Sequence, residues 1–164
     1  MSGSNIRAIV DYTAALAGTI QGVPMPSGTT AGVRATFGAG QGLYGDPLHP
    51  GQLIQPAPED PAEAFTHFSD LPDAPSVEYI TQSGLVQFEW SVPMRLFVPR
   101  GDPRTVRATV LPFYNAYEAA FVPDPTLGGL CLISYIKSFR FESPAEDDWC
   151  WLEIDLHVTE EVAY

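Results

Sequence analysis

The chain has 164 residues, of which 45% are hydrophobic and 12% aromatic, and this composition excludes an intrinsically disordered protein. A chain of this length is expected to fold as one domain, residues 1–164. Its 20 Asp and Glu residues against 8 Lys and Arg residues give a formal net charge of -12, which argues strongly against binding of duplex DNA or an anionic membrane through a basic face.

The first predicted element is an amphipathic helix near the N-terminus. Apolar residues recur with helical spacing from Ile6 to Ile20. Ser4 or Asn5 can cap the start of this helix, and Gly22 can end it. We expect the helix to lie across one face of a β-sheet.

Residues 23–76 contain nine prolines, which exclude most helices there. A short strand is predicted around Val33, and residues 38–76 are predicted to form an extended loop or arm, which is unusual inside a compact domain. Five acidic residues and no Lys or Arg lie between Glu59 and Asp73. The large apolar residues of this part of the arm are candidates for contact with a neighbouring subunit: Phe65, Phe68 and Leu71.

A long strand is predicted over residues 85–98, where apolar and polar residues alternate. Pro93 in its middle indicates an edge position or a bulge. Asp102 and Pro103 then begin a second helix, which is expected to kink or break near Thr109–Leu111 because Pro112 lies inside it.

Two further strands, residues 129–141 and 149–158, are expected to form an antiparallel hairpin across the turn at residues 142–148. The first of them is apolar on both faces in its first half, which predicts a central strand. In the second, Trp149 and Trp151 alternate with the apolar set, so they are interface candidates unless a helix or the arm covers them.

The order of these elements is helix, strand, long arm, strand, helix and hairpin. It predicts an α+β fold in which two helices pack on a mostly antiparallel β-sheet, with the Pro- and Gly-rich arm as an insertion.

No catalytic, cofactor or metal site is predicted. Cys131, Cys150 and the three histidines show no metal-ligand spacing, and two free thiols are expected. The glycines of residues 38–42 lack the Lys-Ser/Thr of a phosphate loop. With no apolar run of about 18 residues and no signal peptide, the chain is expected to be a soluble protein made in a reducing cytoplasm.

One short motif indicates a function more specifically than the features above. Residues 124–130 read Asp-Pro-Thr-Leu-Gly-Gly-Leu, directly after the second helix and before a long strand. Thr126 can bond the turn backbone, Leu127 can fill the core, and Gly128 and Gly129 let the chain reverse into the strand. Together with the size and the element order, this motif resembles the tail terminator and tail-completion proteins of long-tailed bacteriophages. The resemblance covers residues 4–37 and 77–158, and the long arm departs from it.

That resemblance implies a structural virion protein, made in the host cytoplasm and located in the tail or neck. Such proteins form a ring, commonly of six subunits, that caps the tail tube and joins it to the head-tail connector or a head-closure protein. The implied partners are therefore further copies of the chain, the tube protein and the connector, and DNA passes through the ring without specific binding. An acidic wall would repel the DNA phosphates. The acidic residues expected in the lumen or on a ring face are Glu142, Glu146, Asp147, Asp148, Glu153 and Asp155.

Other functions remain open at this point. Another neck or tail component, such as a head-closure protein or a tail tube subunit, fits the same features. A small acid-base hydrolase is an alternative from another class, because Glu153 and Asp155 lie on the same face of the last strand. A monomeric ligand-binding module is a third.

Overall fold

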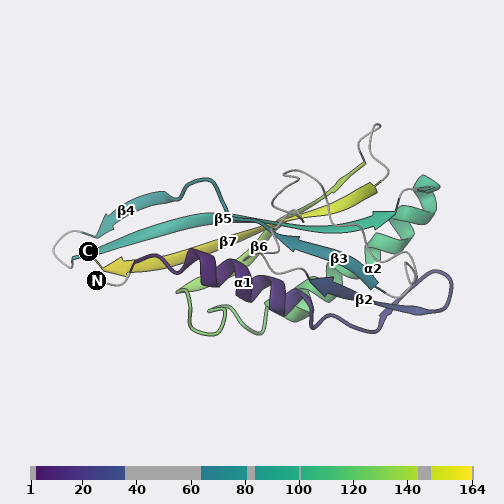
Figure 1. Ribbon diagram of the computed structural model, residues 1–164, viewed down its shortest axis with the longest axis horizontal. Helices are drawn as coiled ribbons and strands as arrows, with labels where there is room; N and C mark the ends of the chain where they lie inside the picture. Colours follow the sequence, from purple (N-terminus) through teal and green to yellow (C-terminus); the bar gives the residue numbers. More distant parts are fainter. Residues whose placement is uncertain (1–2, 36–63, 81–83, 100, 144–148, 164) are drawn as a thin grey trace, which may run out of the picture.

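The structure is a computed structural model that describes residues 3–35, 64–80, 84–99, 101–143 and 149–163. These residues form two helices and seven strands (Figure 1). In chain order the elements are α1 (Ile6–Ala17), β1 (Val23–Pro24), β2 (Thr30–Ala35), β3 (Ala64–Ser69), β4 (Ser76–Ile80), β5 (Leu85–Pro99), α2 (Pro103–Phe121), β6 (Ile133–Glu142) and β7 (Trp149–Ala163). The predicted α+β class is confirmed.

The sheet has the strand order β1-β2-β3-β5-β7-β6, and β4 pairs with β5 beyond the end of β3. Each pair is antiparallel except β2 with β3. The centre of the sheet is the ladder of β5 and β7, which runs in continuous register from Leu85↔Ala163 to Pro99↔Trp149. At about 3.4 Å per residue, this 15-residue ladder is roughly 50 Å long, so it extends beyond the helices at the β4 end (Figure 1).

Both helices pack on one face of this sheet, which we call the helix-covered face. Alternate residues of β5 and β7 point to it and are buried, as the alternation of residues 85–98 predicts. The apolar stripes of α1 and α2 complete the core. Buried members from these four elements are Ile9, Val10, Ala17, Val92, Met94, Leu96, Val98, Val110, Phe113, Tyr117, Phe121, Leu152, Ile154, Leu156 and Val158.

The sequence predicts a loop over residues 38–76, and this prediction is wrong at residues 64–69, which form β3. Phe65, an expected interface residue, instead points to the helix-covered face and packs edge-on against Phe113 at 5.5 Å. Phe68 points to the other face and is buried against Phe97, with their ring centroids 5.3 Å apart. These six residues are extended because they pair with β2 on one side and with β5 on the other. The sequence does not reveal this strand, since it is short and its partners lie far away in the chain.

The prediction of a central strand at residues 129–141 is also wrong. β6 pairs with β7 alone among the described residues, and it therefore lies at an edge of the sheet. Its register shifts between Ile136 and Ser138, so that Lys137 is an extra residue in a β-bulge.

Pro93 lies in the central strand β5, yet its position suits a proline. β3 pairs with β5 at residues 94–97 and β4 pairs at residues 85–89, so this edge of β5 has no ladder partner around Pro93. The carbonyl of Pro93 points to that side and accepts a bond from the Asp70 amide at 2.9 Å. The missing N–H of the proline therefore costs the sheet no ladder bond.

The second helix is continuous where a kink or break was expected. Pro112 lies inside α2, which is helical from Pro103 to Phe121. The proline removes one backbone bond, but the buried residues on either side of it, Val110 and Phe113, hold both halves on the same sheet. Asp102 caps the helix by accepting a bond from the Thr105 amide at 3.2 Å.

Candidate functional site

The face of the sheet opposite the helices, which we call the opposite face, carries the described half of the predicted acidic site. The β5–β7 and β6–β7 registers place three of the expected lumen residues on it: Glu142, Glu153 and Asp155. Glu146, Asp147 and Asp148 lie outside the described residues. Glu78, Glu89 and Glu161 are further acids on this face, and the arginines on it are Arg34, Arg95 and Arg140.

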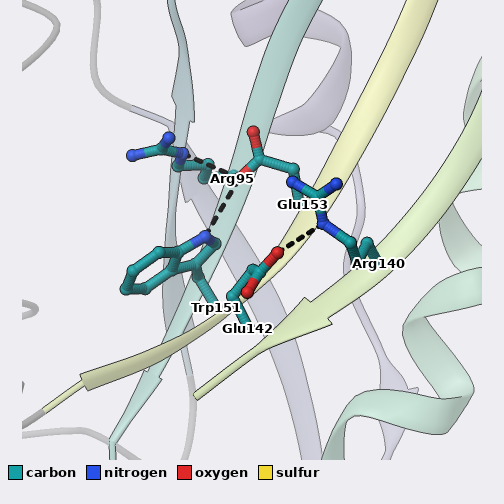
Figure 2. Close-up of polar contacts among 5 residues, drawn as sticks. All are labelled: Arg95, Arg140, Glu142, Trp151 and Glu153. Carbon is teal, nitrogen blue, oxygen red and sulfur yellow. Dashed lines mark hydrogen bonds and ion pairs between the residues drawn. The ribbon is translucent and has the colours of Figure 1, made fainter. Parts of the chain in front are cut away.

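Two of these carboxylates are paired within the chain, as Figure 2 shows. Arg95 Nε donates to Glu153 Oε2 at 2.8 Å, and Trp151 Nε1 donates to the same oxygen at 2.9 Å. Arg140 forms an ion pair with Glu142. The negative charge of the opposite face that no ion pair within the described residues offsets therefore comes from Asp155, Glu78, Glu89 and Glu161, rather than from Glu153 and Glu142.

Trp151 is half-buried in a cluster of side chains from the same chain. Arg95 lies over its indole ring, 5.3 Å from the centroid, and Phe97 packs beside it at 5.8 Å. The indole N–H is already bonded to Glu153. Trp149 begins β7, and its side chain lies outside the described part of the chain.

An open cleft of about 590 Å³ crosses this face beside the segment between β3 and β4. Asp70, Asp73 and Asp155 bring carboxylates to it, and Arg140 brings a guanidinium. Leu71 also lines the cleft and is exposed, and its role as a contact residue stays a prediction. Among the described residues, no group of three or more His, Cys, Asp or Glu is placed to hold a metal ion.

A second set of surface residues was not expected from the sequence. Large apolar side chains are exposed on β4 and β6, two strands with an unpaired edge among the described residues, and beside them: Val77 and Tyr79 on β4, and Leu132, Ile133 and Tyr135 at the start of β6. The Tyr135 ring stacks on His157, and Tyr79 is 69% exposed. The alternation of apolar residues at 77 and 79 and at 133 and 135 was the available signal, but alternation does not tell which face is covered.

An apolar groove lies between α2 and the last residues of β6. It consists of two adjoining cavities of about 450 and 390 Å³ that share Arg107 and Phe141. Val110, Leu111 and Tyr114 line it from α2, and Leu111 is 62% exposed. A groove with these walls suits an apolar side chain of a bound molecule.

The turn at residues 124–130 is braced by the first helix. Tyr12 of α1 donates a hydrogen bond to Asp124, whose other carboxylate oxygen accepts from the Gly128 amide at 3.0 Å. These two bonds lower the pKa of Asp124 and so keep it ionised, the Gly128 amide being the larger influence. Thr126 Oγ1 accepts from the Gly129 amide at 3.3 Å, and Leu127 is fully buried with a φ of 49°. The turn therefore joins α1, α2 and β6.

A buried polar chain connects the helices through β3. His67 Nδ1 lies 2.6 Å from the Tyr117 hydroxyl, and His67 Nε2 lies 2.8 Å from Ser69 Oγ. Thr13 of α1 bonds Ser69 at 2.8 Å. A neutral imidazole accepts at one nitrogen and donates at the other, so it satisfies both partners without a charge. Burial lowers the pKa of His67 to about 3.

The two cysteines are free thiols, as the sequence predicts. Burial, together with the nearby carboxylates of Glu160 and Asp124, raises the pKa of the Cys131 thiol to about 11. At neutral pH this thiol is therefore protonated and is a poor nucleophile. Neither helix of the described chain is long and apolar enough to cross a bilayer.

No protein-family model matches the chain, and no curated protein matches it in sequence.

Proposed function

We propose that this chain is a structural virion protein, similar to a phage tail terminator, that forms a ring capping the tail tube and joining it to the head-tail connector. The observation that carries the proposal is the exposed apolar surface on the edge strands β4 and β6. These strands leave the sheet incomplete in a way that a further copy of the chain would complete.

Exposed apolar edges are a liability for a protein that remains a monomer, because an unpaired strand edge recruits other strands. Val77 and Tyr79 occupy one such edge, and Ile133 and Tyr135 another. β4 carries acidic Glu78 but no Lys or Pro to discourage pairing. A closed ring removes this liability because every edge meets a neighbour.

The architecture supports the same proposal. The described order of helix, strands, helix, turn and hairpin matches the order that the resemblance implies. The Asp-Pro-Thr-Leu-Gly-Gly-Leu motif lies between α2 and β6, where that resemblance requires it, and it holds α1 through the bond from Tyr12 to Asp124.

The opposite face supports a lumen that DNA passes without binding. Its acidic side chains outnumber its arginines Arg34, Arg95 and Arg140, and the last two are paired with glutamates. In the proposed ring this face lines the channel and the helices lie outside. A low-affinity wall suits transit, because each cation on it would hold a phosphate and slow the DNA.

The test is the mass and shape of the pure protein. Light scattering at concentrations up to the millimolar range should give a mass several times 17.8 kDa, and electron micrographs should show single rings. A mass of 17.8 kDa at all concentrations would contradict the proposal, whereas rings that stack into tubes would favour a tail tube subunit. A ring with Glu153 and Asp155 on its outer circumference would refute the acidic lumen.

A further inference from the structure

The outer edges of β4 and β6 lie on opposite edges of the sheet and at different heights along it. β4 pairs with residues 85–89 of β5, which lie beside residues 159–163 of β7, whereas β6 pairs with residues 151–159 of β7. Figure 1 shows β4 at one end of the long axis and the start of α2 at the other. Within the described residues neither edge has a second strand partner. The two edges of one copy are too far apart to pair with each other.

The side chains on these two edges match face by face. On β4, Val77 and Tyr79 pair with Phe88 and Val86 and share the helix-covered face, while Glu78 points to the opposite face. On the second half of β6, Phe139 and Phe141 share the helix-covered face, while Arg140 points to the opposite face. If the two strands are placed side by side, apolar residues meet apolar residues on one face and an acid meets a base on the other.

The groove beside β6 offers space for the β4 side chains. Phe141 forms its sheet wall, and Leu111 and Tyr114 form its helix wall. An added strand at the β6 edge would carry its helix-facing residues directly over this groove. Tyr79, the most exposed large apolar residue of β4, is long enough to enter it.

Positive and negative charges are also separated between the two ends of the molecule, with cations on α2 and β6 and acids around β4. Arg104, Arg107, Lys137 and Arg140 lie on α2 and β6, and they make up half of the eight Lys and Arg residues of the chain. Among the described residues, Arg104 and Arg107 have no ion-pair partner. Residues 70–94, which include β4 and the first two thirds of β5, contain four acids and no Lys or Arg: Asp70, Asp73, Glu78 and Glu89. Glu161 on β7, which pairs with Gln87, adds a further acid at this end of the sheet.

We infer that the β4 edge of one copy adds as a strand to the β6 edge of the next copy, with Tyr79 seated in the groove between α2 and β6 and Glu78 beside Arg140. This inference rests on the proposed ring, which makes a second copy the partner. The contact is heterologous: each subunit donates β4 on one side and receives a β4 on the other. Backbone bonds between the two edges then extend the sheet across the subunit boundary.

Two variants test this head-to-tail pairing. Tyr79→Lys disables the donor edge and leaves the receiving edge intact, and Leu111→Lys does the reverse. Each variant alone should sediment as a monomer of 17.8 kDa. An equal mixture should form a dimer and nothing larger, because a single intact pair of edges remains. Val122→Lys is the matched control, since Val122 is an exposed apolar residue outside both surfaces, and it should still form rings.

The outcomes separate this inference from the proposed function. If wild-type protein forms rings and both variants also form them, the β4–β6 contact is wrong while the ring remains. If the variants are monomeric and their mixture stays monomeric, the two edges do not meet each other and the inference is overturned. If wild-type protein never oligomerises, the proposed function itself fails.

A charge exchange gives a second test that does not depend on the groove. Glu78→Arg and Arg140→Glu should each raise the protein concentration required for assembly about tenfold. The double variant should assemble at nearly the wild-type concentration at low salt. Circular dichroism should show that each variant keeps the wild-type fold. Failure of the double variant to recover would count against the predicted Glu78–Arg140 contact.

Discussion

The imidazole of His67 in β3 and the hydroxyl of Tyr117 in α2 lie 2.6 Å apart in a fully buried position. This bond, with those to Ser69 and Thr13, joins both helices to a strand that the sequence alone assigns to a loop. Because the histidine is buried and neutral, it makes the stability of the fold depend on pH.

Acid should weaken the fold from pH 6.5 downward. The pKa of His67 falls from 6.5 in the unfolded chain to about 3 in the folded one, so protonation favours the unfolded state. The free energy of unfolding should drop by about 2–3 kcal/mol between pH 7.5 and pH 4.5, as measured by urea denaturation at each pH. The His67→Gln variant should be less stable at neutral pH, and its stability should change much less over this window. An unchanged slope in that variant would show that another group titrates.

Gly128 should not tolerate a side chain. Its φ is 68°, and a Cβ there would lie 2.8 Å from Cε2 of Tyr12. We expect Gly128→Ala to lower the free energy of unfolding by about 2–3 kcal/mol, measured by thermal or urea denaturation. Gly129→Ala is the matched control, because Gly129 also has a positive φ but nothing within 4 Å of the added Cβ, and it should cost only about 1 kcal/mol. Equal losses in both variants would mean that the contact with Tyr12 has no effect.

The bonds that Glu153 accepts from Arg95 and Trp151 should add a small, measurable amount to the free energy of unfolding. Glu153→Gln weakens the bonds from Arg95 and Trp151, and we expect a loss of about 1 kcal/mol that shrinks at high salt, since both groups are partly exposed. Asp155→Asn is the control on the same strand, and it should leave stability nearly unchanged. A larger loss for Asp155→Asn would contradict this assignment of partners. The change at Trp151 can be followed by its fluorescence.

Removing the internal proline of α2 should stabilise the protein. Pro112→Ala restores an N–H that can bond the carbonyl of Ala108, and we expect a gain of about 1–3 kcal/mol in urea denaturation. Pro103→Ala is the comparison, because Pro103 lies in the first turn, where a proline is favourable and its removal should give no gain. A loss of stability in Pro112→Ala would indicate that the ring of the proline packs too well to be replaced.

The sequence predicts those parts of the fold that depend on local patterns. The alternation from Val86 to Val98 identifies the buried face of β5, and the helical spacing from Ile6 to Ile20 identifies α1. β3 was missed because its six residues lie among prolines and glycines, and its partners β2 and β5 are set by pairing over long distances in the chain. A local pattern carries no information about such pairing.

The candidate site shows the same limit. The register of β7 was readable, so Trp151, Glu153 and Asp155 were correctly placed on one face. Their partners Arg95 and Phe97 come from β5, and the sequence does not show which strand lies beside β7. The edge position of β6 was missed for a related reason: apolar residues on both faces of a strand look alike whether they are covered by the same chain or are exposed, as Ile133 and Tyr135 are.

The ladder of β5 and β7 also has a consequence for the timing of synthesis. β6 pairs with β7 alone among the described strands, and β7 leaves the ribosome after all of them. Before β7 is synthesised, β6 has no strand that links it to β5 and the rest of the sheet. The sheet edge that β6 later presents has therefore not yet formed. Nascent chains are therefore unable to join one another through this edge before their own folding is finished.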